Sequence, residues 1–110
     1  MARVVTDHSF EAEVRSSSRP VIVEYWAEWC PPCRLVAPVL DEIAADYAGQ
    51  VDLVTVNVDE NPQTASRYGI MAVPTVSVFV GGEHVKQLTG ARSKAAFLRE
   101  LGEFLSAPVG

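Results

Sequence analysis

Two hydrophobic periodicities alternate along the chain and predict strands and helices in turn. Residues 21–27 are β-branched, aromatic and apolar at every position except Glu24, which is typical of a strand buried on both faces. From Leu35 to Tyr47 the apolar side chains follow helical spacing, and Gly49 ends the run. Pro38 removes one backbone hydrogen bond inside this segment, so we expect a single bent helix.

The second half of the chain continues the alternation. Residues 51–58 are apolar and β-rich, and they predict another strand. Asn61 and Pro62 then supply an N-cap and a proline at the first helical position, and Gly69 closes this short helix. A strand, a helix and their connection are therefore expected between residues 51 and 69.

The last third of the chain predicts a β-hairpin and a final helix. Residues 75–80 alternate in side-chain character, and Gly81-Gly82 separates them from a second run at residues 84–88. Ser93 is expected to cap an amphipathic helix, and Asp7 is expected to cap a shorter helix near the start of the chain. The final helix carries Phe97, Leu98, Leu101, Phe104 and Leu105, and the first carries Phe10 and Val14.

The order of these elements predicts the fold class. With one further strand before the helix near the start of the chain, the order is β, α, β, α, β, α, β, β, α, which favours an α/β fold with a central mixed five-stranded sheet and four helices. At 110 residues we expect one domain over residues 1–110, and only the tail at 106–110 is expected to be loose.

The net charge argues against two classes of partner, and the N-terminal segment bears on the location of the protein. Fourteen acidic against nine basic side chains give a formal charge of -5, and no basic cluster is present. We therefore expect no binding to nucleic acid or to membranes. The N-terminus has no apolar segment of signal-peptide length, which predicts a cytoplasmic protein.

The only two cysteines, Cys30 and Cys33, lie between the buried strand and the bent helix. Cys30 is expected near the N-cap and Cys33 at the third helical position, which brings both sulfurs to one helix face. The helix dipole lowers the pKa of a thiol at this end, so Cys30 is expected to attack and Cys33 to resolve. The Cys30 sulfur is therefore expected to be accessible to other proteins. Because Pro31 and Pro32 lack N–H groups, Cys33 is the nearest backbone donor to the N-cap sulfur.

The cysteine pair has two alternative roles besides redox chemistry: binding a metal ion, or packing in the core as unreactive thiols. A structural zinc site needs four ligands, and the only histidines, His8 and His84, belong to separate elements away from the cysteines. We therefore predict no metal.

Several segments together resemble the thioredoxin family, and the match covers nearly the whole chain. The segments are residues 23–34, which contain Trp29-Cys30-Pro31-Pro32-Cys33, residues 57–62, Tyr68-Gly69-Ile70, Val73-Pro74-Thr75 and Thr89-Gly90-Ala91. The resemblance implies a three-layer α/β/α sandwich. It also implies a protein-disulfide reductase that transports electrons and serves cell redox homeostasis.

The resemblance also implies a substrate-binding surface beside the cysteines. Pro74 matches a cis proline, which would bring the Val73 backbone up to the disulfide to pair with an extended substrate segment. The alternative is that Pro74 simply begins a strand. The apolar platform around Cys30 would comprise Trp29, Met71, Ala72, Val73, Gly90 and Ala91, although each could also be ordinary surface or core.

Glu24 occupies the position at which the thioredoxin family usually has a buried aspartate, which assists proton transfer at the resolving cysteine. A carboxylate in an apolar strand should have a raised pKa and could exchange protons with Cys33, directly or through a water. The alternative is a strand-end residue that reaches solvent. The chain departs from the family pattern at Pro31, where glycine is usual, at Glu24, and at Thr55, where a lysine commonly accompanies the acid.

The expected reaction reduces disulfides in partner proteins through a mixed disulfide on Cys30. The resemblance implies re-reduction of the Cys30–Cys33 disulfide by a flavin-containing, NADPH-dependent thioredoxin reductase, with no cofactor bound to the chain itself. We expect a monomer. A less reducing thiol oxidant or isomerase remains an alternative, as does a binding module without activity.

Overall fold

The structure is a computed structural model that describes residues 2–105. The tail expected to be loose, residues 106–110, lies outside the described part of the chain. Within residues 2–105, no helix combines the length and the apolar character needed to span a bilayer.

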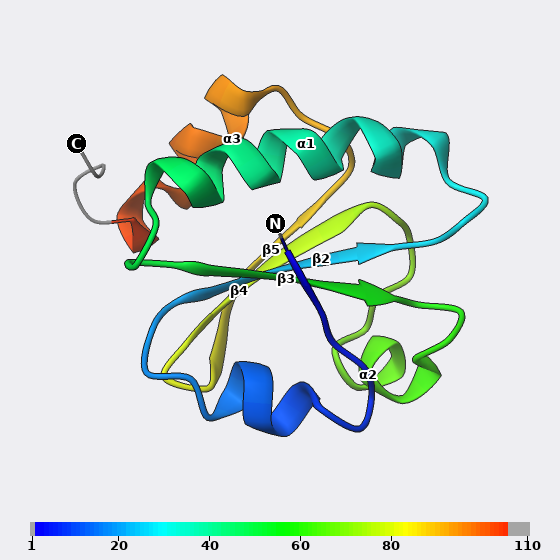
Figure 1. The fold of residues 1–110 in the computed structure, drawn as a ribbon. Helices are drawn as coiled ribbons and strands as arrows, with labels where there is room; N and C mark the ends of the chain where they lie inside the picture. Colours follow the sequence, from blue (N-terminus) through cyan, green and yellow to red (C-terminus); the bar gives the residue numbers. More distant parts are fainter. Residues whose placement is uncertain (1, 106–110) are drawn as a thin grey trace.

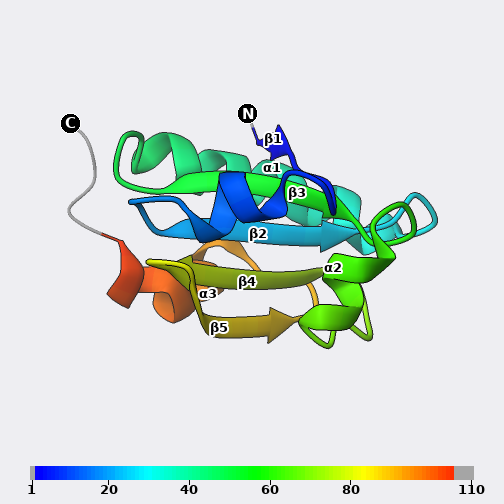
Figure 2. The same cartoon turned by 90° about the horizontal axis from the view of Figure 1, so that it is seen from below.

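A five-stranded mixed sheet forms the centre of the molecule, with the order β1-β3-β2-β4-β5 (Figure 2). Strands β1 and β2 pair with β3 in parallel, whereas β4 is antiparallel to both β2 and β5. The strands are β1 (Arg3–Val4), β2 (Val21–Trp26), β3 (Asp52–Asn57), β4 (Thr75–Val80) and β5 (Glu83–Thr89). This arrangement confirms the predicted mixed sheet with its antiparallel hairpin at the end.

Helices cover both faces of the sheet (Figure 1). Helices α1 and α3 lie on one face, and η1 and α2 lie on the other. The helices are the π-helix η1 (Glu11–Arg15), α1 (Pro31–Asp46), α2 (Pro62–Arg67) and α3 (Lys94–Leu101), which a 3₁₀ turn η2 (Gly102–Phe104) extends. The three predicted layers are therefore present, and α1 runs through Pro38 as one helix.

Each face of the sheet has its own apolar core. The core under α1 and α3 includes Ile22, Leu40, Val76, Phe97 and Leu101. The core under η1 and α2 includes Val5, Phe10, Tyr25, Val56 and Phe79. Because side chains alternate along a strand, Glu24 shares the face of Ile22 and lies on the α1 side of β2.

Helix capping follows the sequence prediction at α3 and differs from it at α2. Ser93 Oγ accepts from the Ala96 N–H at 3.2 Å, as predicted. The side chain of Asn61 makes no cap hydrogen bond to α2, although Asn61 occupies the N-cap position. Asp7, which was expected to cap the first helix, instead accepts hydrogen bonds from the Gln63 N–H at 3.2 Å and the Thr64 N–H at 2.8 Å.

The corrected role of Asp7 has a physical reason. Asn61 Oδ1 accepts from the Asp7 N–H at 2.8 Å, so this acceptor faces the N-terminal segment and not its own helix. Asp7 Oδ1 also accepts from Thr64 Oγ1 at 2.6 Å. Burial acts to raise the pKa of Asp7, but the hydrogen bonds from Thr64 and Gln63 outweigh it and hold that pKa below its usual value.

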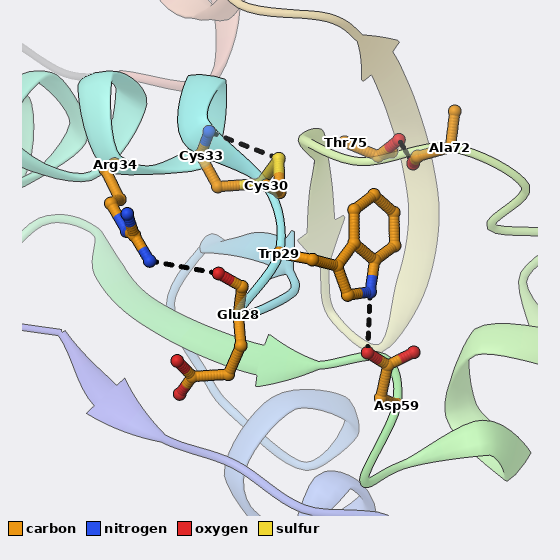
Figure 3. The surroundings of a disulfide bond; sticks show 8 residues. All are labelled: Glu28, Trp29, Cys30, Cys33, Arg34, Asp59, Ala72 and Thr75. Carbon is orange, nitrogen blue, oxygen red and sulfur yellow. Dashed lines mark hydrogen bonds between the residues drawn. A yellow bond between two sulfur atoms is a disulfide. The ribbon is translucent and has the colours of Figure 1, made fainter.

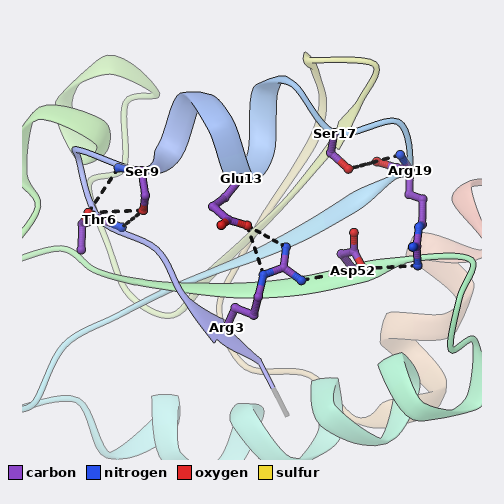
Figure 4. Close-up of polar contacts among 7 residues, drawn as sticks. All are labelled: Arg3, Thr6, Ser9, Glu13, Ser17, Arg19 and Asp52. Atoms are coloured by element: carbon purple, nitrogen blue, oxygen red, sulfur yellow. Dashed lines mark hydrogen bonds and ion pairs between the residues drawn. The ribbon is translucent and has the colours of Figure 1, made fainter.

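Ion pairs fasten the short strand β1 to its neighbours (Figure 4). Arg3 contacts Glu13 of η1 at 3.1 Å and Asp52 of β3 at 4.0 Å, and Arg19 contacts Asp52 at 3.7 Å. The arginines are half exposed, so each pair contributes at most about 1 kcal/mol.

The hairpin between β4 and β5 requires its two glycines. Gly81 and Gly82 both have positive φ angles, 59° and 83°, as the predicted two-residue turn demands. A Cβ at Gly82 would also stand 2.6 Å from the carbonyl oxygen of Arg15. This close approach joins the hairpin to the end of η1.

Candidate active site

A disulfide between Cys30 and Cys33 lies where β2 gives way to α1 (Figure 3). Cys30 is the N-cap of α1, and Cys33 is its third residue, as the sequence predicted. The two Cα atoms are 5.4 Å apart, a separation that a disulfide spans readily. The pair can therefore take up two electrons as the disulfide opens and release them as it closes.

The Cys33 N–H donates to Cys30 Sγ at 3.3 Å. The side chain of an N-cap residue usually accepts from the second or third residue of the helix. Pro31 and Pro32 occupy the first two helical positions, so the third residue is the first with a donor. The predicted donor is confirmed, and it directs a partial positive charge at the first sulfur.

The accessibility of Cys30 differs from the sequence expectation. We expected its sulfur to be open to other proteins, but with the disulfide closed Cys30 is 2 % exposed and Cys33 is 3 % exposed. The reason is packing, since both belong to a small apolar cluster with Ala27, against which Trp26, Val58 and Val73 pack. In the oxidised state the pair lies beneath the surface.

Exposed apolar side chains lie beside the buried pair. Met71 is 96 % exposed and Trp29 is 67 % exposed. Together with Ala72 and Val73 they line a hollow of about 90 Å³, which Val58 and Ile70 complete. Four of the six predicted platform residues thus share one depression.

Gly90 and Ala91 do not line that hollow, and Gly90 contacts the site through Pro74. The Gly90 N–H donates to the Pro74 carbonyl at 2.8 Å, which holds the segment after β5 against the segment before β4. The Val73–Pro74 peptide bond is cis, as expected, and β4 begins only at Thr75. Thr75 Oγ1 donates to the Ala72 carbonyl at 2.7 Å and braces the same turn (Figure 3).

Glu24 is buried, so the alternative of a solvent-reaching strand end is wrong. It is 2 % exposed in the middle of β2, and Thr55 is its partner on β3. Glu24 and Cys33 line one pocket of about 240 Å³ with Trp26, Arg34, Ala37 and Thr55.

The surroundings of Glu24 disfavour its charged form. Burial, together with the negative charge of Asp41, raises the pKa of Glu24 to about 7. Glu24 Oε2 has no hydrogen-bond partner among the described residues. The carboxyl group can therefore take up or give up a proton near neutral pH.

Sequence reasoning missed two contacts that hold the active-site loop. The Trp29 Nε1–H donates to Asp59 Oδ2 at 2.9 Å, and Arg34 donates to the Glu28 carbonyl at 3.0 Å (Figure 3). Asn57 Oδ1 accepts from the Asp59 N–H at 2.9 Å and fixes the turn that carries Asp59. The Asn-x-Asp pattern signals such a turn, but nothing local shows that it faces Trp29.

Residues 2–105 contain no group of three His, Cys, Asp or Glu side chains placed to hold a metal ion. His84 packs against the rings of Tyr68 and Phe79, at centroid distances of 5.4 and 5.0 Å. This histidine is therefore occupied in aromatic packing.

Comparison with known proteins agrees with this geometry. The family model described as Thioredoxin matches residues 1–103. A thioredoxin of Streptomyces clavuligerus is 53 % identical over 86 % of this chain and 88 % of its own length. Thioredoxin 1 of a Nostoc strain is 50 % identical over 94 % and 97 %. A bifunctional thioredoxin reductase/thioredoxin of Mycobacterium leprae is 48 % identical over 90 % of this chain but only 22 % of its own length.

Proposed function

The chain belongs to the thioredoxin family and is a protein dithiol–disulfide oxidoreductase, and on that premise we propose that Cys30 attacks and Cys33 resolves. The observation that carries this order is the hydrogen bond from the Cys33 N–H to Cys30 Sγ at the N-terminus of α1. That donor and the helix dipole both stabilise a thiolate on Cys30.

The reaction reduces a partner disulfide in two exchanges. The Cys30 thiolate attacks one sulfur of the partner, a mixed disulfide forms, and the other partner sulfur leaves as a thiolate. The Cys33 thiolate then attacks Cys30 Sγ and releases the second partner sulfur. Two electrons pass to the partner, and the chain is left with the Cys30–Cys33 disulfide.

Glu24 handles the proton of Cys33 in the second exchange. The two residues line one pocket, and the pKa of about 7 lets Glu24 accept a proton at neutral pH. The shared pocket is large enough to hold a water that would carry the proton, and Thr55 opposite Glu24 contributes no charge.

The apolar hollow receives the partner protein. Extended segments pair with exposed backbone, and in this proposal the partner pairs with the backbone of Val73, which precedes the cis Pro74 and packs against the cysteine cluster. Trp29, Met71 and Ala72 would contact the partner's side chains, and Gly90, bonded to Pro74, and Ala91 would extend this surface. An uncharged surface of this kind suits many different partners.

A thioredoxin reductase would regenerate the dithiol. The bifunctional protein of Mycobacterium leprae carries both names in one chain, which supports such a partner. In this scheme the reductase holds the flavin and takes electrons from NADPH, while the chain itself binds no cofactor. We place this electron transport in the cytoplasm, with the chain acting as a monomer.

Trapping the mixed disulfide tests the order of attack. Cys33→Ser, reduced and then incubated with a disulfide-containing protein such as insulin, should accumulate a covalent complex through Cys30. Cys30→Ser is the matched control and should trap far less. If Cys30→Ser forms the complex and Cys33→Ser does not, the roles are reversed.

Alkylation of the reduced protein tests access to Cys30. Because Cys30 is 2 % exposed in the oxidised state, its sulfur has to become more accessible once the disulfide opens. Iodoacetamide should modify Cys30 faster than Cys33. Equal or inverted rates would contradict the proposed nucleophile.

A further inference from the structure

Met71 is the most exposed large apolar side chain described, and it lines a hollow that borders the cysteine cluster. It is 96 % exposed and lines the same hollow as Trp29 and Val73. Val73 also packs against the cluster that contains Cys30 and Cys33. A readily oxidised thioether therefore occupies the face at which the proposed function places partner proteins.

When Cys30 and Cys33 form their disulfide, Met71 carries the sulfur beside the hollow that an oxidant can attack. With the disulfide closed, neither cysteine offers a thiol, and both are at most 3 % exposed. In the reduced state a Cys30 thiolate would react with an oxidant first. The order of reactivity thus changes with the state of the pair, and Met71 is attacked once the dithiol has been consumed.

We propose that Met71 is an oxidation site through which peroxides weaken the docking of partner proteins. This rests on the proposed function of the hollow. The Met71 thioether attacks a peroxide oxygen, the O–O bond breaks, and a sulfoxide and water (or the corresponding alcohol) form. The sulfur loses two electrons and the peroxide gains them, so the step needs no other reactant.

A sulfoxide changes the chemistry of the hollow. Its S–O bond is strongly polar, whereas Val58, Ile70, Ala72 and Val73 present apolar groups. The Trp29 Nε1–H already donates to Asp59, so it is not free to pair with the new oxygen. Covering the sulfoxide with a partner would therefore bury a polar group without a hydrogen bond.

Peroxide treatment of the oxidised protein tests this proposal. Cleavage after arginine and lysine separates Met1 from Met71, the only two methionines, so mass spectrometry assigns the added oxygen. We expect the KM for insulin disulfides to rise about tenfold after oxidation. The rate with a small disulfide such as oxidised glutathione and the midpoint potential should stay unchanged, because neither needs the hollow. Methionine sulfoxide reductases supplied with dithiothreitol should restore the KM.

Two variants separate the sulfoxide from other damage. Met71→Leu keeps an apolar side chain without sulfur, so peroxide should not change its KM from its own untreated value. Met71→Gln introduces a polar group and should raise the KM for insulin without peroxide. These variants also exclude an effect of Met1.

Three outcomes would overturn the proposal. They are an unoxidised Met71 after treatment that oxidises Met1, an unchanged KM once the Met71 sulfoxide has formed, and an equal loss of activity in Met71→Leu. If the untreated protein failed to reduce insulin at all, the proposed function itself would be wrong, which is a different result.

Discussion

Glu24 on β2 and Cys33 on α1 line one pocket, although they belong to different layers of the sandwich. The pocket holds about 240 Å³, and its lining is largely apolar apart from the Glu24 carboxyl group and Arg34. A buried acid without an ion pair is costly in its charged form. Burial of Glu24 therefore lowers stability above neutral pH, and in the proposed function the same carboxylate accepts the proton of Cys33.

Glu24→Gln should flatten the pH dependence of stability. The folded-state pKa of about 7 exceeds the unfolded value of 4.5, so the folded protein holds the extra proton between these values. The stability that protonated Glu24 contributes is therefore complete below pH 4.5, and it is lost as the pH rises through about 7. The loss is about 3 kcal/mol at 1.36 kcal/mol per pKa unit.

Urea unfolding of the oxidised protein across this range should show the loss in the wild type and not in the variant. The exposed Glu28→Gln should behave as the wild type, and an equally flat wild-type profile would contradict the raised pKa.

Thr55→Lys should lower the pKa of Glu24. Thr55 lies opposite Glu24 on β3, so an ammonium group there would favour the charged carboxylate. The pH profile for release of substrate from the Cys30 mixed disulfide should shift toward acid by about one unit or more. Thr55→Met adds comparable bulk without charge and serves as the control. A shift of the same size in both variants would show that bulk, and not charge, is responsible.

Asp59→Ala should weaken partner binding by freeing the Trp29 indole. The lost hydrogen bond, 2.9 Å in the structure, is worth about 0.5–1.5 kcal/mol, which corresponds to about a two- to tenfold higher KM for insulin. Glu60→Ala removes a neighbouring exposed carboxylate that does not accept the hydrogen bond of the Trp29 indole, and it should leave the KM unchanged. If the KM rose equally in Asp59→Ala and Glu60→Ala, the change in net charge, and not the lost hydrogen bond, would be responsible.

Asp7→Ala should destabilise the protein by removing the cap of α2. The loss of an N-cap acceptor typically costs about 0.5–2 kcal/mol, measured by thermal or urea unfolding at neutral pH. The lowered pKa of Asp7 means that this contribution is complete above its unfolded pKa and disappears as the pH falls through the folded value. Asp7→Asn, which keeps one oxygen acceptor, should retain part of the stability. A cost that persists in strong acid would exclude the carboxylate as its source.

The local sequence pattern was sufficient to predict most helices and strands, because each element depends on residues that are close together in the sequence. The periodicity from Leu35 to Tyr47 places α1, Gly81-Gly82 places the hairpin, and Ser93 caps α3 as predicted. The cysteine spacing likewise predicts a closed pair at a helix start, since three residues of helix bring the sulfurs together.

Only the tertiary structure decided which distant groups meet. Asp7 caps a helix more than fifty residues away, and Asp59 binds the Trp29 indole across a gap in the sequence of thirty residues. The burial of Cys30 against Ala27, Val58 and Val73 and the joint pocket of Glu24 and Cys33 also arise from packing between separate segments. Periodicity records which face of an element is apolar, whereas the partner of a polar side chain depends on how the layers stack.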